Sequence, residues 1–465
     1  MKDYSYLSVI DEKKDWLDSL MDSIWETPEL AFTEYQSART LKLALRSEGF
    51  TLEENLAGIE TAFSGRYGRG KPVIGILGEF DALSGLGQEA GAVCAKPVAN
   101  KDGSTNGHGC GHNLLGVGSL GAAIAVKNYL QTTKKSGTVI YFGCPGEEGG
   151  SGKAFLARDG VFDELDAALC WHPECVTEVR TDGSLANMQI LYKFDGKAAH
   201  AAAAPYEGRS ALDAVELMNI GVNFLREHMI PVARVHYAIT DAGGQSPNVV
   251  QPHAEVLYLI RAPRNDLVQE LYERVNDIAR GAALMTGTKE KHEFIKACSN
   301  LVLNETMQRD LQRIMTEITP PEPSEDDVAY ARELTEKSLR KNPLMDPEHP
   351  LHWQTNPYHE DFSMRFGSTD VGDVSWVCPT AQIRTATWTF GTPGHTWQVT
   401  AQGKTENAHA MARYAAKVLA AEAVELMTDP DLLQKAKEEY RQKVGEKGYE
   451  PPIPRGVRPR AITDI

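Results

Sequence analysis

The sequence lacks the features that mark membrane-spanning and disulfide-stabilised proteins. Its 465 residues contain no apolar run of about 18 residues or more, so we expect no transmembrane helix and no membrane partner. The opening residues, MKDYSYLSVIDEKK, have neither an apolar core nor a cleavage pattern, which argues against a signal peptide. The seven cysteines are scattered between Cys94 and Cys378 without a compact framework, a distribution typical of reduced thiols. We therefore expect a cytoplasmic protein.

Positive charge is also scarce. The 48 Lys and Arg residues are outnumbered by 64 Asp and Glu residues, and the formal net charge is −16. Such a charge repels phosphate backbones, so we expect no nucleic-acid partner, and an anionic small substrate would need a local cationic pocket. The composition, 42% hydrophobic and 24% charged, is ordinary for a globular protein. The chain is longer than a single-core protein, which predicts two domains or one domain with a large insertion.

The motif GHGCGHN is the strongest chemical signal in the chain. It places His108, Cys110 and His112 at alternate positions, which on an extended backbone point to one side. An apolar helical pattern follows at 114–130, with Asn113 placed to cap its first turn. Imidazole nitrogen and thiolate sulfur are ligands of zinc and related metals, so the motif favours a metal site. The alternative is a polar turn in which the cysteine packs and the histidines are solvated.

Strands and helices alternate in the first part of the chain. Apolar runs typical of buried parallel strands occur at 72–78, 137–144 and 166–172, and a further helical pattern occurs at 151–159. This alternation predicts an α/β fold with a mixed, largely parallel sheet. The polar motifs follow the strands, at the edge where such sheets bind ligands. We expect this first part of the catalytic domain to span 1–184.

The pattern changes at about residue 185 and again at about 300. Between them, strands and helices follow in the order β-α-β-β-α-β, which predicts a ferredoxin-like α+β domain over 185–299 whose exposed sheet edge can pair in a dimer. The catalytic domain then resumes over 300–465, with helices expected at 304–317, 325–341, 404–426 and 430–445 and a strand in TATWTF, 385–390. Segment 342–360 shows no clear periodicity, and the tail PPIPRGVRPR is expected to be irregular and to lie on the surface.

A pair of adjacent glutamates follows the second of these apolar strands, in CPGEEGG. Neighbouring carboxylates repel unless cations or protons separate their roles, so we assign Glu148 to a metal and Glu147 to general acid/base catalysis. The alternative is a solvated acidic turn. His172 ends the next strand, and His395 lies in the loop GTPGHTW. The predicted ligand set, sufficient for two zinc or manganese ions that share a water, is Cys110, His112, Glu148, His172 and His395.

Four further residues are candidates for supporting roles. Asp81 follows strand 72–78 and is placed to orient a ligand histidine, or else caps a turn. His200 and Asn248 lie in small-residue and turn segments, and their side chains can donate hydrogen bonds to an oxyanion. Arg261 ends the strand AEVLYLIR, and its guanidinium can clamp a carboxylate with two hydrogen bonds. Without the metal site, the last three would be ordinary surface or turn residues.

Taken in order, these motifs resemble those of the dinuclear metallo-amidohydrolases, a family that includes aminoacylases, glutamate carboxypeptidases and plant auxin-conjugate hydrolases. The motifs that carry the resemblance span about 79–404 and are GHGCGHN, CPGEEGGSG, WHPE, DGKAAHAAAAP, SPNVVQP, STDVGDVSW and GTPGHTWQVTAQG. Within this family the chain is most similar to the B-subunit branch of the p-aminobenzoyl-glutamate hydrolases. The resemblance implies a catalytic α/β domain interrupted by a dimerisation or lid domain, and a homodimer or a heterodimer with a related subunit.

The resemblance also implies roles for individual residues. The five predicted ligands match the family's metal ligands, and Glu147 matches its general base. His200 and Asn248 match residues that reach a neighbouring subunit's active site, and Arg261 matches a contact to the substrate carboxylate. Three positions depart from many relatives: Asn113 stands in place of Asp, Glu79 in place of a metal-binding His, and Cys110 in place of a carboxylate. The thiolate of Cys110 should favour softer metals.

We therefore expect a metal-dependent hydrolase that cleaves the amide bond of N-acyl or N-aroyl amino acids such as p-aminobenzoyl-glutamate. One alternative with the same chemistry is a broad dipeptidase or N-acyl-amino-acid deacylase. A second is a thiol hydrolase that uses Cys110 and a histidine and needs no metal. The third is a metal-binding partner subunit without activity of its own.

Overall fold

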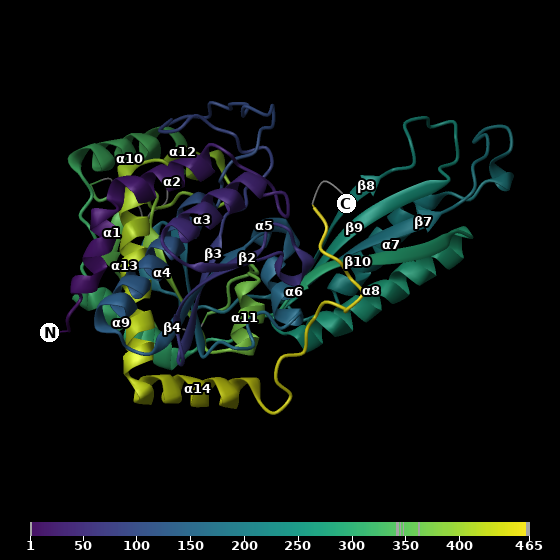
Figure 1. Cartoon of the computed structure of the whole chain (residues 1–465). Coiled ribbons are helices and arrows are strands. Elements are labelled where there is room, and N and C mark those ends of the chain that lie inside the picture. The colour runs from purple at the N-terminus through teal and green to yellow at the C-terminus, as the bar shows by residue number, and fades with distance from the viewer. Residues whose placement is uncertain (1, 341–343, 345, 347, 361–362, 462–465) are drawn as a thin grey trace.

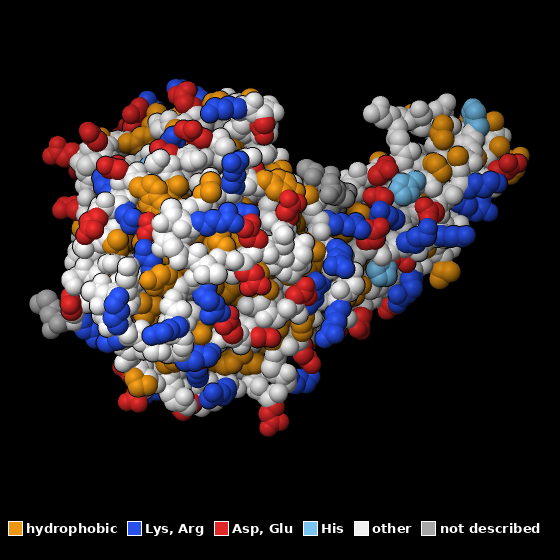
Figure 2. Space-filling view, in the orientation of Figure 1, with side chains coloured by type: hydrophobic (Ala, Val, Ile, Leu, Met, Phe, Trp, Pro, Cys, Tyr) orange, Lys and Arg blue, Asp and Glu red, His pale blue; other side chains and the backbone are white. Residues whose placement is uncertain are grey.

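The computed structural model describes residues 2–340, 344, 346, 348–360 and 363–461, and these form two lobes (Figure 1). The larger lobe is built on an eight-stranded sheet with the order β1 (Thr51–Glu54), β2 (Phe63–Arg69), β4 (Gly137–Cys144), β3 (Val73–Glu79), β5 (Ala167–Glu174), β12 (Thr380–Ala386), β6 (Val176–Val179) and β11 (His352–Thr355). Figure 2 shows the two lobes joined by a narrower region, with acidic and basic side chains interspersed over the surface of the larger one.

The centre of the large sheet is parallel. Strand β3 pairs in parallel with β4 and β5, and β5 pairs in parallel with β12. Every residue of β3, β4 and β12 is buried, as expected for strands covered by helices on both faces. Strands β1, β2 and β6 add antiparallel pairings nearer the edges. The predicted mixed, largely parallel sheet is confirmed.

Two long helices pack together against this sheet. Helix α4 (His112–Thr133) lies beside α13 (Glu406–Thr428) in Figure 1, and most of α4 is buried all round. Small residues allow this close packing: a side chain at Gly118 would place its Cβ 2.6 Å from Trp171 of β5. The Trp171 indole N–H also donates to the Leu115 carbonyl oxygen over 3.1 Å. These contacts hold the start of α4 at the carboxyl ends of the parallel strands.

The remaining helices surround the large lobe. The first three are α1 (Ser8–Glu12), α2 (Lys14–Trp25) and α3 (Tyr35–Ser47). Two short helices, α5 (Glu147–Gly150) and α6 (Gly152–Arg158), follow β4 directly. The later ones are α9 (Glu305–Glu317), α10 (Glu325–Ser338), α11 (Val371–Val377), α12 (Trp397–Gln402) and α14 (Pro430–Val444). Among the described residues, no helix combines the length and apolar character needed to cross a bilayer.

The smaller lobe is a four-stranded antiparallel sheet with two helices. Its elements along the chain are β7 (Ala186–Asp195), α7 (Ala211–Arg226), β8 (Arg234–Asp241), β9 (His253–Ala262), α8 (Asn265–Thr286) and β10 (Lys289–Cys298). The spatial order β10-β7-β9-β8 is that of the ferredoxin-like arrangement, so the predicted second fold is confirmed. We propose 185–299 as the bounds of this lid domain, with 1–184 and 300–465 forming the catalytic domain.

The C-terminal tail has no helix or strand among its described residues and runs between the two lobes (Figure 1). The Tyr449 hydroxyl donates to the Asp373 carboxylate of α11 over 2.8 Å. Ile453 is buried in the core that includes the lid sheet. The Arg460 guanidinium pairs with Glu293 of β10 over 2.7 Å. The tail therefore ties the lid to the catalytic lobe.

Three local predictions are wrong. The strand expected in TATWTF lies earlier, because β12 is the segment TAQIRTA, whose buried Arg384 conceals the apolar pattern of a central strand. Asn113 is not a cap: it lies inside α4, and its amide donates to the Gly403 carbonyl oxygen over 3.0 Å. The helix expected over 325–341 ends at Ser338, and residue 341 lies outside the described residues.

Candidate metal centre

The motif GHGCGHN forms a turn instead of an extended segment. Gly111 has a positive φ of 73°, and α4 begins at His112 directly after it. The turn separates the side chains of His108, Cys110 and His112. His108 is buried, its Nε2 lies 3.0 Å from the Ile24 carbonyl oxygen, and it belongs to none of the groups of possible ligands found among the described residues. The expectation that all three side chains share one side is therefore wrong, and of the three only Cys110 and His112 belong to groups of possible ligands among the described residues.

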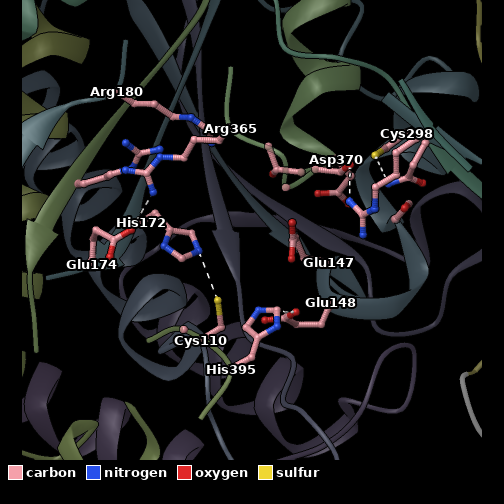
Figure 3. Close-up of a pocket in the computed structure, with 18 of the residues that line it drawn as sticks. Cys110, Glu147, Glu148, His172, Glu174, Arg180, Cys298, Arg365, Asp370 and His395 are labelled. Atoms are coloured by element: carbon pink, nitrogen blue, oxygen red, sulfur yellow. Dashed lines mark hydrogen bonds and ion pairs between the residues drawn. The ribbon is translucent and has the colours of Figure 1, made fainter. Parts of the chain in front are cut away.

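Two groups of ligand atoms meet at Cys110. One consists of Cys110, His112 and His172, the other of Cys110, Glu148 and His395, and within each group the atoms lie within 4.8 Å of one another. The Cys110 sulfur is 3.5 Å from Nε2 of His172, and Nε2 of His395 is 3.2 Å from a Glu148 oxygen (Figure 3). The five residues proposed as ligands thus converge from separate parts of the chain, with the thiol common to both groups.

Unsatisfied polar atoms indicate that this arrangement fits metal ions. Nδ1 of His112 lies 2.9 Å from Oδ1 of Asp81, which leaves Nε2 directed into the centre. In the described structure both that Nε2 and the Oε1 of Glu148 are buried and make no hydrogen bond, although a Glu79 oxygen lies 3.3 Å from the Nε2. Buried polar atoms without partners are rare in folded proteins unless a ligand satisfies them. Imidazole, thiolate and carboxylate together suit zinc or manganese.

Asp81 connects the two groups. One of its carboxylate oxygens lies against the His112 ring, and the other accepts a hydrogen bond from the Glu148 backbone N–H over 2.8 Å. The residue follows β3, whose carboxyl end adjoins those of β4 and β5. Asp81 therefore has the contacts needed for its predicted role, the orientation of a ligand histidine from behind.

The two adjacent glutamates have opposite electrostatic environments. Burial raises the pKa of Glu148, but the hydrogen bond from His395 and the positive charge of His112 outweigh it and lower that pKa to about 2. Burial and the negative charges of Glu79 and Glu148 raise the pKa of Glu147 well above its usual range. Glu148 is thus suited to bind cations as a carboxylate, whereas Glu147 is suited to hold a proton.

A cavity of about 530 Å³ opens beside the centre and is lined by both lobes. Glu147 and Arg261 line it, and the Arg261 guanidinium donates to the Ser368 hydroxyl over 2.7 Å. His200 and Asn248 are not among its lining residues. Instead they lie together in the lid, where the Ala201 N–H donates to the Asn248 carbonyl oxygen over 2.9 Å.

A buried ion pair behind the centre was not predicted. Lys153 is fully buried, and its ammonium lies 2.6 Å from Glu79 and 2.6 Å from Asp370. The other Glu79 oxygen lies 3.3 Å from Nε2 of His112. Glu79, His112 and Glu147 also form a compact group of possible ligands. Because Lys153 already neutralises Glu79, we assign Glu79 to the support of the centre and not to a separate ion.

Three arginines of the cavity wall also escaped prediction. Arg180, Arg365 and Arg384 all line the cavity and all pair with Asp182, at 3.0, 2.6 and 2.7 Å respectively. Figure 3 shows Arg180 and Arg365 on one side of Glu147 and Cys298 on the other. The three arginines come from separate segments and follow no local motif. The only sequence signal was indirect, since an anionic substrate requires a cationic pocket in an acidic protein.

The fold and the ligand groups together define a two-domain metallohydrolase. The model of peptidase family M20/M25/M40 matches residues 75–459, and the chain belongs to this family. It is 47% identical over 463 residues to the B subunit of p-aminobenzoyl-glutamate hydrolase from Escherichia coli (strain K12), with 95% of each chain covered. It is 29% identical over 457 residues to the Xaa-Arg dipeptidase of Mus musculus, with 94% of this chain and 91% of the relative covered.

A solved structure supports the same fold. The YXEP protein of Bacillus subtilis, described as a dinuclear metal binding peptidase from the M20 family, superposes with a TM-score of 0.54 at 17% identity. The match covers 88% of this chain and 99% of that one. The expected family, fold and class of enzyme are therefore confirmed: the chain is an M20 metallo-amidohydrolase.

Proposed function

We propose that this chain hydrolyses the amide bond between an acyl or aroyl group and an acidic amino acid, as in p-aminobenzoyl-glutamate, with two zinc or manganese ions. The observation that carries the proposal is the pair of ligand groups joined at Cys110 beside Glu147. The 47% identity to one subunit of p-aminobenzoyl-glutamate hydrolase supports this substrate. A metal-free thiol hydrolase is disfavoured, because Cys110 belongs to both ligand groups.

Each residue of the site has a separate role in amide hydrolysis. When bound, two divalent ions would polarise the amide carbonyl and lower the pKa of water. Cys110 would hold both ions, His112 and His172 one of them, and Glu148 and His395 the other, as the two ligand groups indicate. Glu147 takes the proton from the attacking water and passes it to the leaving nitrogen. The Arg261 guanidinium, which faces the cavity, binds the α-carboxylate of the substrate.

The substrate proposal is tested by assaying the purified chain alone on p-aminobenzoyl-glutamate and on an alanyl-arginine dipeptide. We expect kcat/KM to be at least about tenfold higher on the aroyl-glutamate, because the Arg261 guanidinium, which forms no salt bridge among the described residues, attracts carboxylates and repels an arginine side chain. A preference for the arginine dipeptide would favour the dipeptidase alternative. Activity that survives EDTA would favour the thiol hydrolase, and no activity on either substrate would favour a partner subunit without activity of its own.

We further propose that the working enzyme is a dimer, of two copies or with a related second subunit. The Escherichia coli relative is itself named as one subunit of a hydrolase. Strand β8 is an edge of the lid sheet and exposes Tyr237 and Ile239, which can pair with a partner. His200 and Asn248 do not line the cavity of their own chain, as expected for residues that act at the active site of a neighbouring subunit.

Sharing of active sites is tested by refolding a mixture of His200→Ala and Glu147→Gln protein. Each mixed dimer contains one site with neither substitution if His200 acts across the dimer. Random mixing would then restore up to about a quarter of wild-type turnover from two nearly inactive parents, because half of the dimers are mixed and each has one of two sites intact. The measurement is specific activity before and after mixing. No recovery, in mixtures shown to contain mixed dimers, would contradict sharing.

A further inference from the structure

One basic residue of the cavity is buried without a partner among the described residues. Lys296, in β10, lines the cavity and is only 9% exposed. Within the described part of the chain, no carboxylate or hydrogen-bond acceptor contacts its ammonium group. Three of the cavity arginines differ from Lys296, since Arg180, Arg365 and Arg384 are each paired with Asp182. Burial of an unpaired charge is unfavourable, so a buried ammonium in a substrate cavity indicates an anionic ligand.

Lys296 and Arg261 flank the same strand and face the same cavity. Arg261 of β9 is opposite Asn187 of β7, and Lys296 of β10 is opposite Gln189 of β7, two residues further along. Side chains two residues apart on a strand share a face, and both basic residues line the cavity. Their strands lie two strand spacings apart, about 10 Å, and each side chain extends from there into the cavity.

The Asn187 carboxamide between the two cations is also incompletely satisfied. Its Nδ2 donates to the Cys298 sulfur over 3.1 Å, while its Oδ1 is buried without a partner in the described structure. Figure 3 shows Cys298 near Asp370, across Glu147 from Arg180 and Arg365. Among the described residues, this wall of the cavity therefore carries two cations without a salt bridge to a carboxylate and one carboxamide with an unpaired oxygen, whereas the arginines of the opposite wall are paired with Asp182.

We infer that Lys296 determines substrate specificity by binding the side-chain carboxylate of the leaving amino acid. The inference rests on the proposed amidohydrolase function, in which Arg261 binds the α-carboxylate. A glutamate leaving group has two carboxylates, and the wall has two basic residues, Arg261 and Lys296, that form no salt bridge within the described structure. The aroyl group of the same substrate is uncharged and supplies no partner for Lys296. The preferred substrates are therefore amides of dicarboxylic amino acids, with neutral and basic amino acids disfavoured.

The test compares p-aminobenzoyl-glutamate with p-aminobenzoyl-glutamine, which differ only in the charge at the end of the side chain. For Lys296→Met, we expect the ratio of kcat/KM values, glutamate over glutamine, to fall about 10- to 100-fold, the usual effect of a charge-assisted hydrogen bond. Lys296→Arg keeps the charge and should keep the ratio within about threefold of wild type. Lys291→Met is the matched control, because Lys291 lies on the same strand but is largely exposed and pairs with Asp195.

Each result decides between ligand binding and a structural role. A structural role for Lys296 predicts equal losses on both substrates, or a lower unfolding temperature for Lys296→Met; an unchanged ratio also overturns the inference. If wild-type protein cleaves neither substrate, the proposed function fails, and calorimetric titration with free glutamate and glutamine then tests Lys296 separately. Selective glutamate binding that is lost in Lys296→Met supports the assignment, and equal binding of the two ligands overturns it.

Discussion

Replacement of Glu147 by Gln is expected to lower turnover about 10²- to 10⁴-fold, the usual contribution of a general base, while both ions remain bound. Glu147 lines the cavity next to Glu148 but belongs to neither of the ligand groups that contain Cys110. Its raised pKa, caused by burial and by neighbouring carboxylates, suits a group that holds a proton during the reaction. A glutamine has the same shape but cannot take that proton.

The measurement is kcat at saturating substrate, together with the metal content of the same preparation. Glu89→Gln serves as a control, because Glu89 is exposed and pairs with the side chain of Lys96 at the surface. Turnover of Glu147→Gln within about threefold of wild type would show that Glu147 is not the general base. A fall in turnover that accompanied loss of metal would instead make Glu147 a ligand.

Replacement of Cys110 by Ser is expected to have a larger effect, because it weakens both halves of the centre. The Cys110 sulfur belongs to both ligand groups, so no other single substitution removes a ligand atom from each. A serine hydroxyl does not ionise near neutral pH and is a poor ligand for zinc. We expect less than about one ion per chain and a loss of turnover of about 10³-fold or more.

Cys94→Ser is the matched control for this prediction. Cys94 is an exposed free cysteine and belongs to none of the ligand groups, so the substitution should change neither metal content nor turnover. Turnover is measured first as purified and then with added zinc or manganese. If Cys110→Ser protein had wild-type turnover without added metal, Cys110 would not be a ligand shared by the two ions.

The clustering of the candidate ligands could be expected from the sequence, because their positions follow from strand order. Glu148 follows β4, His172 is near the end of β5, and His395 lies in the loops after β12. The carboxyl ends of adjacent parallel strands meet at one edge, so residues far apart in the chain could be expected together. The sharing of Cys110 between two groups depends on the turn at Gly111, which spacing alone did not predict.

Buried charged residues account for most of what the sequence analysis missed. Arg384 lies inside β12 and Lys153 inside α6, both buried and both paired with carboxylates from distant segments. Their partners could not be predicted from the sequence, since no local pattern links Lys153 to Asp370. Lys296 carried a weak signal, because a lysine between Ile295 and Ala297 interrupts an apolar strand segment.

The most direct test of the centre is the number of metal ions per chain in wild-type and Cys110→Ser protein, measured side by side by elemental analysis. The account predicts close to two zinc or manganese ions per wild-type chain, fewer than one in the variant, and turnover that falls in step as a chelator removes the ions. Wild-type protein that is fully active without metal, or a variant that retains both ions, would contradict it.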